Sequence, residues 1–181
     1  MGSLFERLAS AAETDGALGV SLVTQPPGVA TPLHVHTLEA EAFFLLDGTM
    51  SYQVGDTLYR LSAGYFIYLP KGVPHAFRVT GTSPVQFLGF TVPGGLMDLY
   101  DEVGMPATDR RLPGRDGPPV EEEIRRWNEV SPATGYALSG HQFSARPDGS
   151  EADGTSRKAV GLHQRGTIQW WTTRASSHER G

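Results

Sequence analysis

Cysteine is absent from the 181 residues of this sequence, and charged residues are few. Without cysteine, disulfide bonds and thiolate metal sites are excluded, so any bound metal must take nitrogen and oxygen ligands. Charged residues make up 19% of the chain, the formal net charge is −5, and no segment concentrates Lys or Arg. Because phosphate backbones are bound by basic surfaces, we expect no nucleic-acid partner.

Long hydrophobic runs are absent as well. No apolar stretch approaches the roughly 20 residues needed to span a membrane, and residues 1–12 lack the basic start and apolar run of a secretion signal. Glu6 stands where N-myristoylation requires Ser or Thr. These features predict a cytoplasmic protein that does not bind membranes.

Glycine and proline, by contrast, are abundant, at 22 and 13 residues. Such a composition favours short strands joined by tight turns over a helical bundle. Residues 19–92 contain roughly seven or eight strand-like segments, with turn residues about every 8 to 12 positions. The sequence therefore predicts an all-β fold, a small β-barrel or jelly roll over residues 16–93, with short flanking helices.

The segments outside the barrel are predicted to be helical or polar. Ser3 and Glu6 form a capping-box pattern that predicts a short helix within residues 1–15. Two apolar faces at helical spacing predict a C-terminal helical extension over residues 94–143. Residues 144–181 are predicted to be a polar tail, to which we assign no role. The helical positions are Leu96, Leu99, Tyr100 and Val103, then Val120, Ile124 and Trp127.

Two motifs that begin with glycine contain three histidines and one glutamate, all within residues 34–75. The predicted strand with His34 and His36 sends alternate side chains to one face, so both imidazoles can share one ion. His75 opens a strand after the compact turn 70–74 and supplies the opposite wall. The motifs read Gly28-x5-His34-x-His36-x4-Glu41-x6-Gly48 and Gly64-x5-Pro70-x-Gly72-x2-His75.

The carboxylate of this set is predicted to be Glu41. It would have the wrong parity if the strand of the histidines simply continued, so a turn over residues 37–40 must precede it. Glu39, the rival carboxylate, would lie in that turn and ranks second. Three imidazoles and one carboxylate accept Fe(II), Ni, Mn, Co or Zn. We therefore predict one divalent transition metal ion per chain, held by His34, His36, Glu41 and His75.

Alternation along the neighbouring strands predicts five apolar side chains that face the interior. Most serve as core, and some must line the mouth of a small barrel, where they suit a flat aromatic substrate. These candidates for the substrate pocket are Phe43, Leu45, Tyr52, Phe66 and Phe77. The remaining histidines, His141, His163 and His178, are interpreted as surface or hydrogen-bonded residues without a role in the site.

The strand after Glu41 also carries apolar residues on its outward face, namely Ala42, Phe44 and Leu46. A barrel exterior that faces solvent is not expected to be so apolar. Either the helix predicted over residues 96–103 covers this row or a second subunit does. We predict a homodimer, the commonest assembly of soluble proteins.

The two motifs resemble the two conserved motifs of the cupin superfamily, and the similarity extends over roughly residues 16–92. Val79 stands where the second motif of that family closes on Asn, a departure that removes a turn-stabilising amide and no ligand. Within the superfamily, residues 74–95 and the helical extension resemble single-domain bacterial cupins of the quercetin 2,3-dioxygenase-like group. The resemblance implies a cupin barrel with a metal site.

The resemblance leaves three functions open. The first is a metal-dependent dioxygenase of secondary metabolism that uses O2 and acts on a flavonol-like or other phenolic or enolic aromatic molecule. There, Glu41 would be catalytic, as metal ligand and as acceptor of the substrate proton. The second is a metal-dependent isomerase or cyclase-type tailoring enzyme of a small metabolite. The third is a non-catalytic small-molecule-binding cupin, and the fold alone does not choose among the three.

Overall fold

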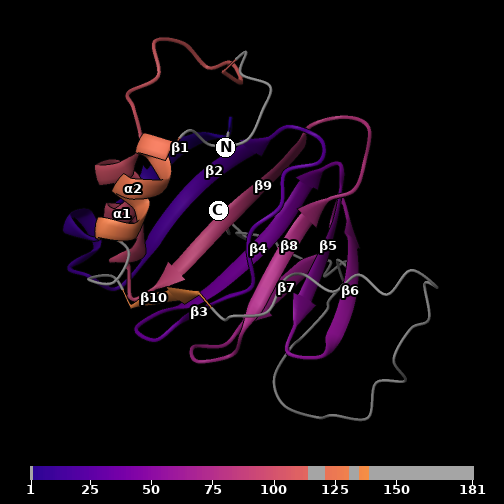
Figure 1. Ribbon diagram of the computed structural model, residues 1–181, viewed down its shortest axis with the longest axis horizontal. Helices are drawn as coiled ribbons and strands as arrows, with labels where there is room; N and C mark the ends of the chain where they lie inside the picture. The colour runs from indigo at the N-terminus through magenta and orange to yellow at the C-terminus, as the bar shows by residue number, and fades with distance from the viewer. Residues whose placement is uncertain (1, 114–120, 131–134, 139–181) are drawn as a thin grey trace, which may run out of the picture.

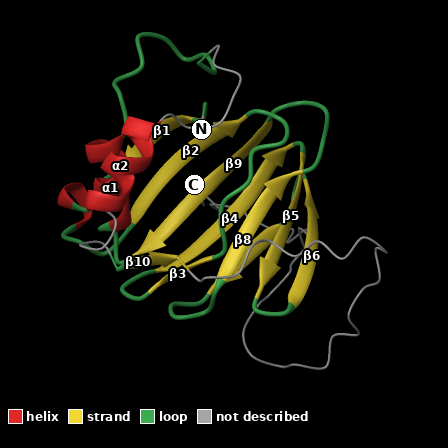
Figure 2. Ribbon diagram, in the orientation of Figure 1, coloured by secondary structure: helices red, strands yellow, loops and turns green. Residues whose placement is uncertain are grey.

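Two antiparallel sheets of five strands make up the computed structural model, which describes residues 2–113, 121–130 and 135–138. The sheets have the orders β1-β2-β9-β4-β7 and β10-β3-β8-β5-β6, and the all-β prediction is confirmed. Figure 2 shows the helices together at the left of the view, beside β1 and β2. The strands are β1 (Leu4–Ala9), β2 (Gly19–Gln25), β3 (His34–His36), β4 (Ala40–Asp47), β5 (Thr49–Val54), β6 (Thr57–Ser62), β7 (Phe66–Leu69), β8 (His75–Val79), β9 (Val85–Val92) and β10 (Tyr136–Leu138).

The core lies between the two sheets and is built mainly from alternate residues along β2, β4, β7 and β9. On β4, Phe43 and Leu45 are buried, and Leu45 lies opposite the buried Phe87 of β9. Burying one such side chain stabilises a fold by about 1.5–3 kcal/mol. The other fully or almost fully buried apolar residues include Val23, Met50, Tyr52, Leu61, Ile67, Leu69, Val79 and Val85.

The helix predicted near the N-terminus is wrong, because Leu4–Ala9 forms strand β1. This strand pairs with β2, with Phe5 opposite Val23, and so satisfies backbone groups along the edge of β2. The reciprocal hydrogen bonds of a capping box instead join Ser10 and Glu13, at the start of the 3-10 helix Ala12–Thr14. Sheet pairing therefore outweighs the local helical pattern at Ser3 and Glu6.

The C-terminal extension contains both predicted helices and one strand that was not predicted. Helices α1 (Leu96–Val103) and α2 (Glu121–Val130) lie together beside β1 and β2 in Figure 1. An ion pair between Arg7 and Asp101 joins β1 to α1. Strand β10 pairs with β3, so the extension is not wholly helical. The predicted polar tail and the histidines at 141, 163 and 178 lie outside the described residues.

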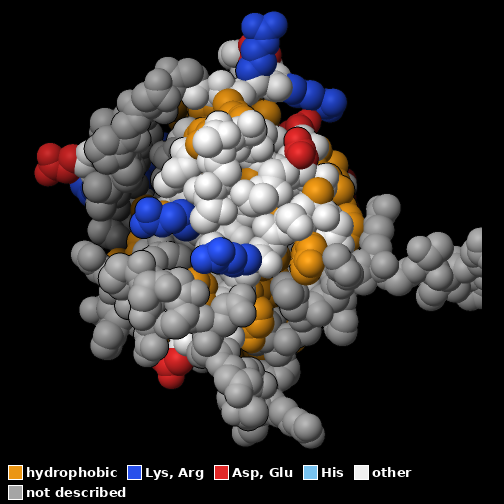
Figure 3. All heavy atoms as spheres, turned by 90° about the vertical axis from the view of Figure 1, so that its right-hand side faces the viewer, with side chains coloured by type: hydrophobic (Ala, Val, Ile, Leu, Met, Phe, Trp, Pro, Cys, Tyr) orange, Lys and Arg blue, Asp and Glu red, His pale blue; other side chains and the backbone are white. Residues whose placement is uncertain are grey.

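The described surface agrees with the low charge of the sequence. On the face shown in Figure 3, charged side chains are few and lie scattered among uncharged and hydrophobic ones. Within the described ranges, no helix has the length and apolar character needed to cross a membrane.

Candidate functional site

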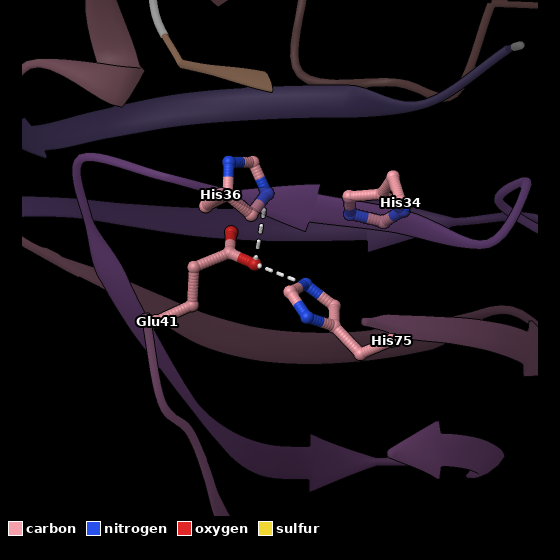
Figure 4. Close-up of side chains that lie close together, drawn as sticks. All are labelled: His34, His36, Glu41 and His75. Carbon is pink, nitrogen blue, oxygen red and sulfur yellow. Dashed lines mark hydrogen bonds and ion pairs between the residues drawn. The ribbon is translucent and has the colours of Figure 1, made fainter. Parts of the chain in front are cut away.

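The three histidines of the two motifs come from neighbouring strands of one sheet. His34 and His36 are both buried on β3, while Val35 between them points to the other side. His75 begins β8 and lies directly opposite His34 in the ladder. Glu41 comes from β4 in the facing sheet and is also buried. The site therefore joins the two sheets, and Figure 4 shows its four side chains converging.

Each of these four residues offers one ligand atom, and all four atoms lie within 4.8 Å of one another. Glu41 Oε2 is 3.0 Å from His75 Nε2 and 3.3 Å from His36 Nε2. Two ligands at right angles, each about 2.1 Å from one ion, lie about 3.0 Å apart. The spacing and the N3O donor set therefore fit a single divalent transition metal ion, whose identity the donor set leaves open.

The turn before Glu41 lies where parity required it. Residues 37–39 bend away from β3, and Gly72 donates its backbone N–H to His36 O at 2.8 Å. Gly72 has a φ of 78°, which a residue with a side chain rarely adopts. Glu39 is buried in the bend, but its Oε1 lies toward Gly95, where an added Cβ would be 3.6 Å away. Glu41, and not Glu39, faces the histidines.

Backbone carbonyls orient two of the imidazole rings. His34 Nδ1 donates to Pro32 O at 2.8 Å, and His75 Nδ1 donates to Val73 O at 2.9 Å. In each case the carbonyl lies two residues before the histidine. Fixing the proton on Nδ1 leaves Nε2 as the nitrogen that can bind a metal.

Burial and mutual contact set the charges of the cluster. Burial opposes the charge on Glu41, but its hydrogen bonds with His36 and His75 outweigh this and hold the pKa of the carboxyl well below its usual value. Burial, aided by the neighbouring His75, lowers the pKa of His34 to about 3. Burial lowers the pKa of His36, but the Glu41 carboxylate raises it by a larger amount, so the net shift of the pKa is upward. An ionised carboxylate and a neutral His34 are the forms that bind metals.

A cavity that is partly open to solvent borders the metal cluster. Three of the five predicted lining residues, Phe43, Tyr52 and Phe77, border it, as do His34, Glu41 and His75. Leu45 does not, because it lies one inward position further along β4, within the core. Phe66 does not either. It pairs with Phe44 on the outer face, while Ile67 and Leu69 of β7 point inward.

Aromatic side chains from outside residues 16–93, the predicted barrel, also line the cavity. The sequence did not assign these side chains to the cavity. Tyr136 of β10 stacks on His34, with 4.8 Å between the ring centroids. The preceding residue, Gly135, is held in place because its carbonyl oxygen accepts hydrogen bonds from both the backbone N–H and the Oγ1 hydroxyl of Thr37. Burial raises the pKa of Tyr136 to about 12, so it is a neutral hydroxyl. From Tyr136 the ring contacts continue pair by pair. The centroid distances are 5.3 Å from Tyr136 to Trp127, 6.1 Å from Trp127 to Tyr100 and 4.5 Å from Tyr100 to Phe5.

Comparisons with known proteins agree with this fold. Residues 21–91 match the family described as the cupin domain. Over 117 residues, or 65% of this chain, the sequence is 27% identical to quercetin 2,3-dioxygenase from Bacillus subtilis strain 168. The matched stretch spans only 33% of the length of that relative.

Solved structures show more distant likenesses. The cupin domain of Cnp3 from Schizosaccharomyces pombe is 17% identical, with a TM-score of 0.47, and the match covers 58% of this chain and 74% of that one. A predicted oxalate decarboxylase from Thermotoga maritima is 24% identical, with a TM-score of 0.47 and coverage of 50% and 80%. The family match covers residues 21–91, which contain both motifs, and identifies this segment as a cupin domain.

Proposed function

We propose that this protein is a metal-dependent dioxygenase that acts on a flavonol-like or other phenolic or enolic aromatic molecule. The observation that carries the proposal is the position of the buried His34, His36, Glu41 and His75 cluster at the wall of an aromatic-lined cavity. Cupins related to this chain are often metal-dependent enzymes, and the similarity to quercetin 2,3-dioxygenase favours oxygen chemistry.

In this proposal, the three imidazoles and Glu41 hold one divalent transition metal ion. When bound, the ion would act as a Lewis acid that lowers the pKa of a substrate hydroxyl, and it would orient the substrate and O2. The side chains of Phe43, Phe77 and Tyr136 pack around the substrate ring and exclude water. Glu41 is ionised and faces the cavity, so it can accept the proton of the bound hydroxyl.

Oxygen uptake tests the proposal directly. Protein loaded separately with Fe(II), Ni, Mn, Co or Zn is mixed with a panel of flavonols and catechols in air-saturated buffer. We expect at least one metal form to consume O2 in proportion to the substrate lost. Conversion of the substrate at the same rate without O2 would instead show an isomerase or cyclase. Tight binding without conversion would show a non-catalytic binding protein.

We also propose that the chain forms a homodimer through the outer face of the sheet that contains β4. Helix α1 packs against α2 and β2. In the order of this sheet, β9 and β4 separate β2 from β7, so α1 lies toward the edge opposite β7. Apolar side chains on the outer face include Leu46, Tyr68 and Val92, which are 40%, 40% and 53% exposed. A symmetric second copy would cover this surface.

Sedimentation equilibrium at micromolar concentration is expected to give the mass of two chains. A Leu46→Glu/Tyr68→Glu variant is expected to sediment as a monomer, because the new charges would be buried at the interface. Leu138→Glu is a matched control, since Leu138 is an exposed apolar residue on the other sheet. A wild-type protein that is monomeric under these conditions contradicts the dimer.

A further inference from the structure

Four buried polar atoms around the cavity have no hydrogen-bond partner among the described residues. They are Ser21 Oγ, Gln25 Oε1, Tyr52 OH and Thr91 Oγ1, and every one of these residues lines the cavity. The four residues are at most 5% exposed. A buried hydroxyl or amide without a partner is costly, so such groups are rare unless a ligand or an ordered water completes them. Four residues with such atoms line this one cavity, which points to a ligand with polar groups.

Two of these hydroxyls, those of Thr91 and Ser21, come from strands of the sheet that also holds Glu41. Thr91 on β9 lies directly opposite Glu41, so it stands beside the carboxylate in the same row of the sheet. Ser21 on β2 lies in the next inward row, opposite Gly89, about 7 Å along the strands. Neither residue belongs to the metal cluster. The two residues therefore stand at different positions along one wall of the cavity.

Gly89 leaves the space between these groups open. A Cβ added there would lie 3.4 Å from Ser21 Oγ and 3.5 Å from the Phe43 ring. Gly89 therefore presents no side chain to the cavity, and Ser21 Oγ and the Phe43 ring lie next to this position.

The charge of the lining limits the ligand further. Among the described residues that border the cavity, none is Lys or Arg. A phosphate or carboxylate would find no cation there apart from the metal, whereas hydroxyl and carbonyl groups can pair with uncharged side chains. The lining thus favours an uncharged molecule with several oxygen substituents.

We propose that Ser21 and Thr91 form a recognition wall that hydrogen-bonds the oxygen substituents of a flat, multiply hydroxylated aromatic molecule. The aromatic class of the ligand rests on the proposed function, but the recognition wall itself does not depend on turnover. Ser21 and Thr91 would determine specificity, and the four metal ligands would hold the ion beside the reacting oxygen.

Equilibrium binding without O2 tests this proposal, with protein loaded with redox-inert Zn(II). Calorimetric titrations compare quercetin with 3-hydroxyflavone, which keeps the hydroxyl beside the carbonyl and lacks the other hydroxyls. We expect wild type to bind quercetin more tightly. Ser21→Ala and Thr91→Val should each weaken quercetin binding roughly three- to tenfold, the effect of one net hydrogen bond, and leave 3-hydroxyflavone within about twofold. Thr24→Val, on the outer face of β2, is the matched control.

Thermal unfolding of the ligand-free variants separates recognition from structure. Because the two hydroxyls have no partner in the described protein, removing them should not lower Tm. A Tm lowered by several degrees, or equal weakening of both flavonols, would show that the hydroxyls support the fold instead. Equal wild-type affinity for the two flavonols, or binding of neither, also overturns the proposal.

The outcomes also distinguish this proposal from the dioxygenase itself. Selective quercetin binding that depends on Ser21 and Thr91, without O2 uptake by any metal form, would remove the dioxygenase and keep the recognition wall. O2 uptake with unchanged flavonol selectivity in both variants would do the reverse.

Discussion

A His75→Ala variant is expected to lose stoichiometric metal binding. His75 lies opposite His34 in the ladder, and its Nε2 is 3.0 Å from Glu41 Oε2, so its loss opens one side of the ligand set. Changes to groups that merely orient metal ligands already cost about 10–100-fold in affinity, and removal of a ligand should exceed that. Metal analysis after reconstitution and dialysis measures the effect, and His34→Ala should behave in the same way.

Two controls make the His75 result interpretable. His141→Ala should keep one ion per chain, because that histidine was assigned no role in the site. Circular dichroism should show that His75→Ala retains its strand signal, since a small buried truncation is expected to lower stability without changing the fold. Full metal content in folded His75→Ala and His34→Ala would show that the metal site is assigned to the wrong residues.

The second large effect is expected at Glu41. In a Glu41→Gln variant the side chain keeps its size but cannot accept a proton, and general-base catalysis typically contributes about 10²–10⁴-fold to a rate. We therefore expect O2 uptake with the best flavonol to fall at least about 100-fold. The three histidines should still hold metal, although more weakly. Initial rates at saturating metal separate the loss of the base from the loss of the ion.

Glu39→Gln provides the matched control for this experiment. Glu39 is as buried as Glu41 and only two residues away, but it faces Gly95 and not the histidines. Burial raises the pKa of Glu39, which brings it closer to the neutral state that Gln imitates. Its replacement should leave O2 uptake near the wild-type rate. A slow Glu39→Gln enzyme beside a normal Glu41→Gln enzyme would reverse the roles of the two carboxylates.

The metal cluster could be predicted from the sequence because its geometry is largely local. His34 and His36 share a face by strand alternation, and Glu41 follows after a bend whose existence parity required. His75 follows a turn that the glycine and proline pattern already predicted. These constraints act within a few residues of each ligand, so a single sequence contains them.

The cover and the polar wall of the cavity depend instead on contacts between distant segments. Tyr136 reaches His34 only because β10 pairs with β3, about a hundred positions away along the chain. Ser21 and Thr91 look like ordinary strand residues until the register places Thr91 beside Glu41 and Ser21 in the next inward row. No local periodicity contains this information.

Two predictions failed because a local pattern allowed more than one outcome. A capping-box spacing occurs at both Ser3–Glu6 and Ser10–Glu13, and pairing with β2 decides which one forms. On β7, both faces are apolar, so alternation could not tell whether Phe66 or Ile67 points inward. In both cases tertiary contacts decided between local alternatives.

The central claim is that His34, His36, Glu41 and His75 hold one metal ion, and anomalous scattering from metal-loaded crystals tests it most directly. Data collected at the absorption edge of the loaded metal should show one strong peak per chain. That peak should lie roughly 2.0–2.3 Å from the three Nε2 atoms and from a Glu41 carboxylate oxygen. A peak at other residues, or its absence from crystals with one equivalent of metal, would contradict the account.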